Sequence, residues 1–120
     1  MKNMINWFEL PVVDLKRATA FYEQVLATSL KTENSQGTPM AILKVDGVSG
    51  ALVKVPNRKP SSDGTLIYFN VDGQLAAVLG RVEKAGGKQL GPVVDMGPQG
   101  SYAVLVDTEG NQVGVHSVAR

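Results

Sequence analysis

One pattern of apolar residues occurs twice along this chain, and this duplication constrains the fold more than any other feature. An apolar run at residues 6–14 ends at Asp14, and a second run at residues 65–72 ends at Asp72. Aspartate is a frequent helix N-cap, because its carboxylate accepts hydrogen bonds from the free N–H groups of the first turn. Each half therefore reads as strand, helix and three further strands. Two copies of one supersecondary unit predict a ligand cleft between them.

Apolar residues at helical spacing follow each Asp and predict an amphipathic helix on a sheet. The first stripe consists of Leu15, Ala18, Phe21, Tyr22, Val25 and Leu26. The second consists of Leu75, Val78, Leu79, Val82 and Ala85 and ends at Gly86-Gly87, a C-cap signal. The remaining strands are expected at residues 29–33, 40–45, 51–55, 88–95, 102–106 and 112–116.

The chain is expected to form one α+β domain over residues 1–120. We predict module one at about residues 4–56, a polar connector at 57–64 that contains Arg58 and Lys59, and module two at about 65–118. The connector is rich in turn formers and too short to separate independent domains. The turn signals Asp46-Gly47 and Glu109-Gly110-Asn111 hold corresponding places in the two modules, which strengthens the case for a repeat.

Composition excludes several classes of function. The 12 basic and 11 acidic residues nearly cancel, so nothing attracts a polyanion, and we expect no nucleic-acid partner. The chain has no cysteine, which rules out disulfides, thiolate metal ligands and a thiol nucleophile. No apolar run approaches the roughly 20 residues that span a bilayer, and the N-terminus lacks a signal-peptide core. We therefore expect a cytoplasmic protein without a membrane partner.

Two segments carry a resemblance to a known family. The first is Phe8-Glu9-Leu10-Pro11-Val12-Val13-Asp14-Leu15 with Ala20-Phe21-Tyr22, and the second is Asp107-Thr108-Glu109-Gly110-Asn111-Gln112-Val113-Gly114. Together they resemble the opening and closing signatures of the vicinal oxygen chelate superfamily, which includes glyoxalase I, bleomycin-resistance proteins and extradiol dioxygenases. The resemblance implies two tandem βαβββ modules that curl into an incomplete β-barrel around a divalent metal. It also implies a homodimer, in which barrel halves are sometimes exchanged between subunits.

The positions at which the family places its metal ligands hold residues without donor atoms. Counting along the resembling segments puts Trp7, Leu66 and Gly114 at three of them and Leu52 at or beside the fourth. An indole, two aliphatic side chains and a glycine offer no electron pair to a divalent ion. We therefore predict no metal and no other cofactor, and the family's metal-dependent mechanism is not expected here.

The period-two alternation of strands predicts which side chains share a face with these positions. The predicted cleft is lined by Trp7, Glu9, Leu52, Leu66, Tyr68, Gly114 and His116, with Tyr102 near its rim. Such a mixture of apolar, aromatic and a few polar groups is typical of a small-molecule pocket. Trp7 and Tyr68 are either stacking platforms or ordinary core aromatics.

Glu9 and His116 are the candidate catalytic residues, and each has a plain alternative. His116, the only histidine, is an acid or base, half of a relocated metal site with Glu9, or a residue that hydrogen-bonds to backbone or solvent. Glu9 meets a cation or a ligand, or points to water. The leading hypothesis is metal-free binding of a small, partly apolar molecule. A lyase or isomerase with a relocated metal and a non-catalytic scaffold are the alternatives.

Overall fold

The computed structural model describes residues 3–35 and 37–118, so the outermost ends of the predicted domain lie outside the described part. The first half contains β1 (Trp7–Pro11), α1 (Leu15–Val25), β2 (Lys31–Ser35), β3 (Thr38–Leu43) and β4 (Ser49–Val53). The second half contains β5 (Tyr68–Asn70), α2 (Leu75–Val82), β6 (Lys88–Asp95), the short 3-10 helix η1 (Gly97–Gln99), β7 (Ser101–Val106) and β8 (Gln112–Ser117). Each half is therefore one βαβββ module, as the repeat predicts.

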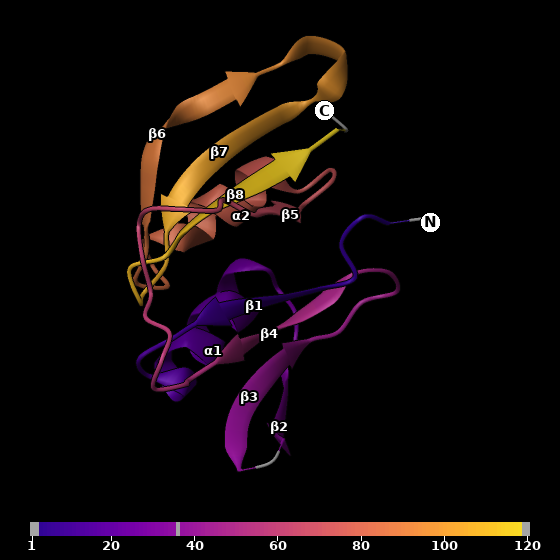
Figure 1. Ribbon diagram of the computed structural model, residues 1–120. Coiled ribbons are helices and arrows are strands. Elements are labelled where there is room, and N and C mark those ends of the chain that lie inside the picture. The colour runs from indigo at the N-terminus through magenta and orange to yellow at the C-terminus, as the bar shows by residue number, and fades with distance from the viewer. Residues whose placement is uncertain (1–2, 36, 119–120) are drawn as a thin grey trace.

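Each module forms its own four-stranded sheet with the same topology. The strand orders are β1-β4-β3-β2 and β5-β8-β7-β6, and only the first strand of each module pairs in parallel. Figure 1 shows the two sheets one above the other, with α1 beside β1 and β4 and α2 beside β5 and β8. The predicted α+β architecture with two modules and no closed barrel is confirmed.

The two modules differ in how their helices begin. Asp14 caps α1 as predicted, since its side chain accepts a hydrogen bond from the backbone N–H of Arg17. The prediction that Asp72 caps the second helix is wrong. Asp72 accepts instead from the backbone N–H of Val118, and α2 begins only after Gln74, which forms no side-chain cap bond.

The second module also has the shorter first strand. We predicted a strand over residues 65–71, whereas β5 spans only Tyr68–Asn70. The backbone of Val71 still bonds to His116, just as that of Val12 bonds to Val53 in module one. These matching bonds align the two modules residue by residue around Val12 and Val71.

One hydrophobic core joins the modules. It contains the buried faces of α1 and α2 and one face of each sheet. Phe8 of β1 and Phe69 of β5 meet edge to face with ring centroids 5.8 Å apart, and Tyr22 packs 5.7 Å from Phe69. Because β1 and β5 each stand at the end of a sheet, this contact brings the inner edges of the two sheets together.

A polar network fastens module two to module one beyond the C-terminal end of β1. The side chain of Glu109 is 0% exposed and accepts from the backbone N–H groups of Val13 and Asp14, both at 2.8 Å. Its other partners are the guanidinium of Arg17, with Nε at 2.7 Å, and the hydroxyl of Thr108. Burial alone would raise the pKa of Glu109, but these hydrogen bonds lower it to about 2.

Tyr22 and Asp107 form the buried centre of this network. The tyrosine hydroxyl donates to Asp107 Oδ2 at 2.6 Å, and Asn111 Nδ2 donates both to Asp107 Oδ2 and to the carbonyl of Pro11. Burial, reinforced by the carboxylate of Asp107, raises the pKa of Tyr22 well above its ordinary value. We refer to Arg17, Tyr22, Asp107, Glu109 and Asn111 as the junction network.

The helices are short. Within residues 3–35 and 37–118, no helix has the length and apolar character that crossing a bilayer requires.

Candidate functional site

Strand register determines which side chains share the face of each sheet that the helices do not cover. Residues that pair across neighbouring strands project to the same side. In module one, Glu9 pairs with Ala51, whereas Leu10 pairs with Leu52, a member of the helix-covered core. In module two, Tyr68 pairs with Gly114, and Tyr102 pairs with His116. We call the side away from the helices the open face.

Leu52 does not lie on the open face, so its predicted place beside Trp7 and Glu9 is wrong. It is 0% exposed, and both its partners, Leu10 and Ala41, belong to the helix-covered core. The residue that corresponds to Gly114 is Ala51, since each lies four positions after the glycine of its turn, Gly47 or Gly110. Alanine offers no donor atom either, so the correction does not restore a metal ligand.

Trp7 and Glu9 lie together on the open face of module one, as predicted. Trp7 Nε1 donates to Glu9 Oε2 at 3.2 Å, and Arg58 Nη1 lies 3.0 Å from Glu9 Oε1. Glu9 has thus met a cation, one of the alternatives that the sequence left open. This cation, Arg58, comes from the polar connector.

Tyr68 covers Gly114 on the open face of module two. A Cβ atom at Gly114 would clash with the tyrosine ring, so only glycine allows this close approach. The residue Tyr68 is 47% exposed, and its ring meets that of Tyr102 at an interplanar angle of 87° with centroids 5.5 Å apart. An aromatic ring therefore occupies the space into which a side chain at position 114 would project.

His116 of β8 pairs with Tyr102 of β7. Its imidazole Nε2 lies 2.7 Å from the carbonyl oxygen of Gln99. Glu9 belongs to the other sheet and is bonded to Trp7 and Arg58. The two candidate catalytic residues therefore form separate contacts on separate sheets.

The donor set can be tested against the divalent metal that the resemblance implies. Trp7, Leu66, Ala51 and Gly114 supply no lone pair suited to such an ion, and the ring of Tyr68 fills the space beside Gly114. Across the described ranges, no three His, Cys, Asp or Glu side chains converge in a group that could hold a metal ion. These residues do not fit the family's metal. That the protein works without one stays a prediction.

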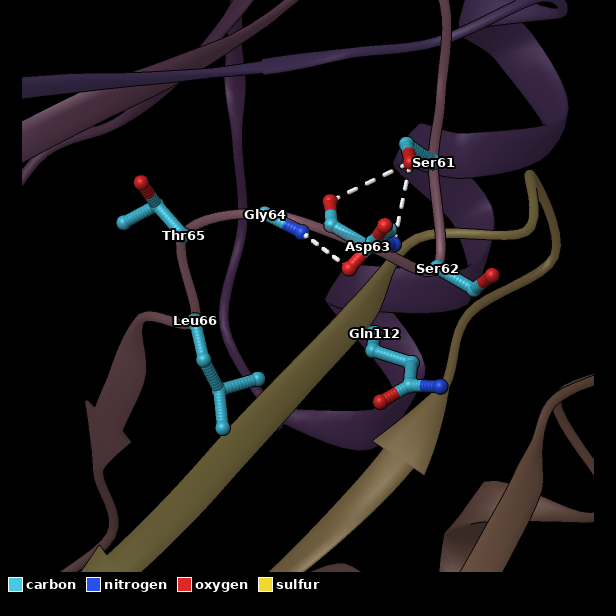
Figure 2. A pocket seen from close by; sticks show the side chains of 7 residues that line it. All are labelled: Ser61, Ser62, Asp63, Gly64, Thr65, Leu66 and Gln112. Atoms are coloured by element: carbon cyan, nitrogen blue, oxygen red, sulfur yellow. Dashed lines mark hydrogen bonds between the residues drawn. The ribbon is translucent and has the colours of Figure 1, made fainter.

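Leu66 lines a hollow that none of the other predicted site residues lines. This small hollow of about 230 Å³ is also lined by Gln112 and residues 61–65. Figure 2 shows these side chains. Ser61 and Asp63 hydrogen-bond to one another there, and Gly64 donates to Asp63. Ligand pockets usually occupy about 300–1,000 Å³, so this hollow is too small to hold a drug-sized molecule.

A larger groove of about 1120 Å³ lies between the two modules at the N-terminal end of β1. Aliphatic and aromatic side chains dominate its wall, and they include Ile5, Phe8, Leu43, Ile67, Tyr68, Phe69 and Val78. The polar residues of the wall are Thr28, Ser29, Lys44, Asp46, Asn70, Asp72, Gln74 and Arg81. Of the predicted site residues, only Tyr68 lines this groove.

Most groove residues were absent from the sequence-based prediction. That prediction assumed a single cleft over the open face, whereas the groove follows the inner edges of β1 and β5 and reaches the start of α2. Arg81, for example, donates through both Nε and Nη2 to the carbonyl of Val25 at the end of α1. The spacing of apolar residues within one module cannot predict a surface that forms only when the two modules pack together.

Comparison with known proteins gives consistent matches. A sequence model of the glyoxalase/bleomycin resistance protein/dioxygenase superfamily matches residues 4–115. A glyoxylase-like domain-containing protein from Didymella fabae is 28% identical over 122 residues, which cover 92% of this chain and 91% of the relative.

Solved structures share the fold at low sequence identity. A glyoxalase/bleomycin resistance protein from Albidiferax ferrireducens T118 superposes with a TM-score of 0.75 at 16% identity, covering 96% of this chain and 98% of the other. The fosfomycin resistance protein FosX from Listeria monocytogenes gives a TM-score of 0.71 at 15% identity, covering 98% and 94% of the two chains.

Proposed function

The chain belongs to the glyoxalase/bleomycin resistance protein/dioxygenase superfamily, and from this premise we propose that it binds a small, partly apolar molecule without the family's usual divalent metal. The groove between the modules carries the proposal. Its volume of about 1120 Å³ suffices for a drug-sized ligand, and its wall combines many apolar side chains with a few polar ones. The hollow at Leu66 is too small for such a ligand, and its wall is mostly polar.

The donor chemistry supports the metal-free part of the proposal. A carboxylate or imidazole is needed at several converging positions, and the family positions here carry indole, aliphatic and glycine residues instead. The alternative of a relocated metal bound by Glu9 and His116 is less well supported. Each of these side chains already has a partner within the chain, Arg58 for Glu9 and the Gln99 carbonyl for His116.

We also propose that the protein is a homodimer. Among residues 3–35 and 37–118, the four strands at the sheet ends, β2, β1, β5 and β6, each have one edge without a partner strand in their sheet. Such edges favour association unless they are covered. Sedimentation equilibrium tests this proposal, since the mass of two chains is expected and the mass of one chain would contradict it.

Binding is tested with purified protein by thermal shift and calorimetry, using indole as a planar probe and adamantanol as a non-planar apolar probe. A ligand at about 100 times its Kd adds about 2.7 kcal/mol to the stability of the folded state, so at least one probe should raise the Tm by several degrees. Failure of both probes, together with a wider apolar panel, would favour the scaffold alternative.

A matched pair of variants locates the binding. Val45 is 56% exposed and lines the groove, whereas Val93 is 45% exposed and lies on β6, outside it. Val45→Gln should weaken the binding of adamantanol several-fold, and Val93→Gln should leave it unchanged. Equal effects would place the ligand elsewhere.

Elemental analysis tests the metal-free part independently. Protein purified without chelators should contain well under one equivalent of zinc, nickel, manganese or iron. A stoichiometric divalent ion that is retained on dialysis would overturn this part of the proposal and would revive the relocated-metal alternative.

A further inference from the structure

Three side chains on the open face of module two, Tyr68, Tyr102 and His116, form what we call the aromatic corner. Tyr68 is its floor. Because Gly114 has no side chain, the tyrosine ring packs closely against it, and 47% of the residue Tyr68 stays exposed. A floor of this kind presents a half-exposed aromatic surface on which a planar group can stack.

Tyr102 forms the wall of the corner. Its ring stands at 87° to that of Tyr68 with the centroids 5.5 Å apart, an edge-to-face geometry that fixes both rings relative to one another. Tyr102 is half-buried and lies in the middle of the sheet, where β7 is paired on both sides. The wall is therefore supported by the sheet rather than by a loop.

His116 supplies a polar group with a defined direction. A carbonyl oxygen can only accept a hydrogen bond, so the contact between Nε2 and Gln99 places a proton on Nε2. In the neutral imidazole the remaining nitrogen, Nδ1, then carries a lone pair and can accept a hydrogen bond. The backbone carbonyl of Gln99 thus selects the tautomer of the ring.

The corner contains no formal charge from the residues that pair within it. Asn70, the partner of His116 on β5, is neutral and uses its Oδ1 to accept from the backbone N–H of Asp72. The carboxylate of Glu9 belongs to the other sheet and is held by Arg58. Tyr68, Tyr102 and His116 therefore offer stacking and one hydrogen bond, and none of the three pairs with a charged residue across the strands.

We propose that the aromatic corner binds an uncharged, planar aromatic group that carries an N–H or O–H donor, with the ring stacked on Tyr68 and the donor directed to His116 Nδ1. This inference rests on the proposed function, for which it names the recognised part of the ligand. Tyr68 also lines the groove between the modules, so the rest of a bound molecule can extend into the groove.

The test compares two probes that differ by one donor, indole and N-methylindole, by calorimetry with the full chain. The net worth of one hydrogen bond corresponds to a preference for indole of about 3- to 10-fold in Kd. His116→Phe should abolish this preference, and His116→Gln, which keeps both a donor and an acceptor, should restore part of it. Tyr68→Leu should weaken both probes by a similar factor.

Comparing two probes within one variant cancels any loss of folded protein, so an unstable variant does not mimic the expected result. A preference for indole that survives His116→Phe would overturn the role of His116. If adamantanol binds as tightly as both indoles and Tyr68→Leu leaves all three unchanged, the aromatic corner is wrong while the proposed binding function stands. If none of the three probes binds but another member of the apolar panel does, the aromatic corner is wrong and the proposed binding function stands. If the whole panel fails, both proposals fail.

Discussion

The space between the two modules differs at the two ends of β1. Beyond the C-terminal end of β1, the junction network joins them through hydrogen bonds of buried side chains, among them Tyr22 to Asp107 and Asn111 to the Pro11 carbonyl. At the N-terminal end, the groove separates them. One end is closed by satisfied polar groups, and the other leaves apolar surface open to a ligand.

The difference originates in two turns that hold equivalent places in the repeat. The turn of module two, residues 107–111, carries Asp107, Glu109 and Asn111, and all three bond to module one. The equivalent turn, residues 44–48, carries lysine, aspartate and valine at the matching positions and lines the groove. A duplicated fold can thus use one copy of a turn for stability and leave the other beside a binding surface.

Removing Glu109 is expected to give the largest effect, because this side chain supports the closed end. Glu109→Ala leaves the backbone N–H groups of Val13 and Asp14 without their carboxylate partner. We expect a loss of about 2–4 kcal/mol in the free energy of unfolding, measured by urea denaturation. Glu83→Ala, at an exposed position after α2, is the control and should change stability by less than about 0.5 kcal/mol. Equal losses would show that the junction network does not stabilise the closed end.

The same carboxylate should make the closed end sensitive to acid. The pKa of Glu109 is lowered from 4.5 to about 2, so its contribution is fully present above pH 4.5 and declines as the pH falls toward 2. Unfolding free energies of the wild type and of Glu109→Gln, measured between pH 7 and pH 2, should therefore converge in acid. A constant difference across this range would contradict the hydrogen bonding described for Glu109.

The sequence predicts each module better than it predicts the contacts between the modules. The repeat and the N-cap at Asp14 predict the two modules, because period-two and helical spacing depend only on nearby residues. Asp72 fails as a cap because a distant partner, the N–H of Val118, takes its carboxylate. The spacing of nearby residues in the sequence cannot predict a hydrogen bond to a residue so distant along the chain.

The sequence does contain a signal for the correct position of Leu52. Counting four residues from the turn glycine, which identifies Gly114 in module two, identifies Ala51 when applied to Gly47. The pairing of β4 with β1 then puts Ala51 beside Glu9 and sends Leu52 to the core. The groove offered no such signal, because its wall consists of residues from both modules and exists only once they pack.

In each module, an aromatic ring on the first strand covers a glycine on the strand that pairs with it. These two contacts allow a second comparison of the modules. Phe8 covers Gly50 on the helix-covered side, whereas Tyr68 covers Gly114 on the open face. A new methyl group clashes with the ring in both cases. Gly50→Ala should cost about 2–3 kcal/mol because Phe8 packs against the core, and Gly114→Ala about 1 kcal/mol or less because Tyr68 can turn into solvent.

Urea denaturation of both alanine variants measures this difference. The double variant with Tyr68→Leu provides the control, since it should remove most of the cost of Gly114→Ala. A larger loss for Gly114→Ala than for Gly50→Ala would mean that the open face is covered in solution, as a dimer contact there would require.

Arg58→Ala should give the smallest effect. Arg58 and Glu9 are 59% and 33% exposed in their side chains, so water screens the pair, and we expect a loss of about 0–1 kcal/mol that shrinks with added salt. Trp7, the only tryptophan, shares the carboxylate, so its fluorescence should shift even where stability does not. Lys59→Ala, at the exposed neighbouring position, is the matched control and should leave the emission unchanged. Because Glu9 keeps its bond to Trp7 in either variant, a large loss of stability would mean that the connector is held by more than this exposed ion pair.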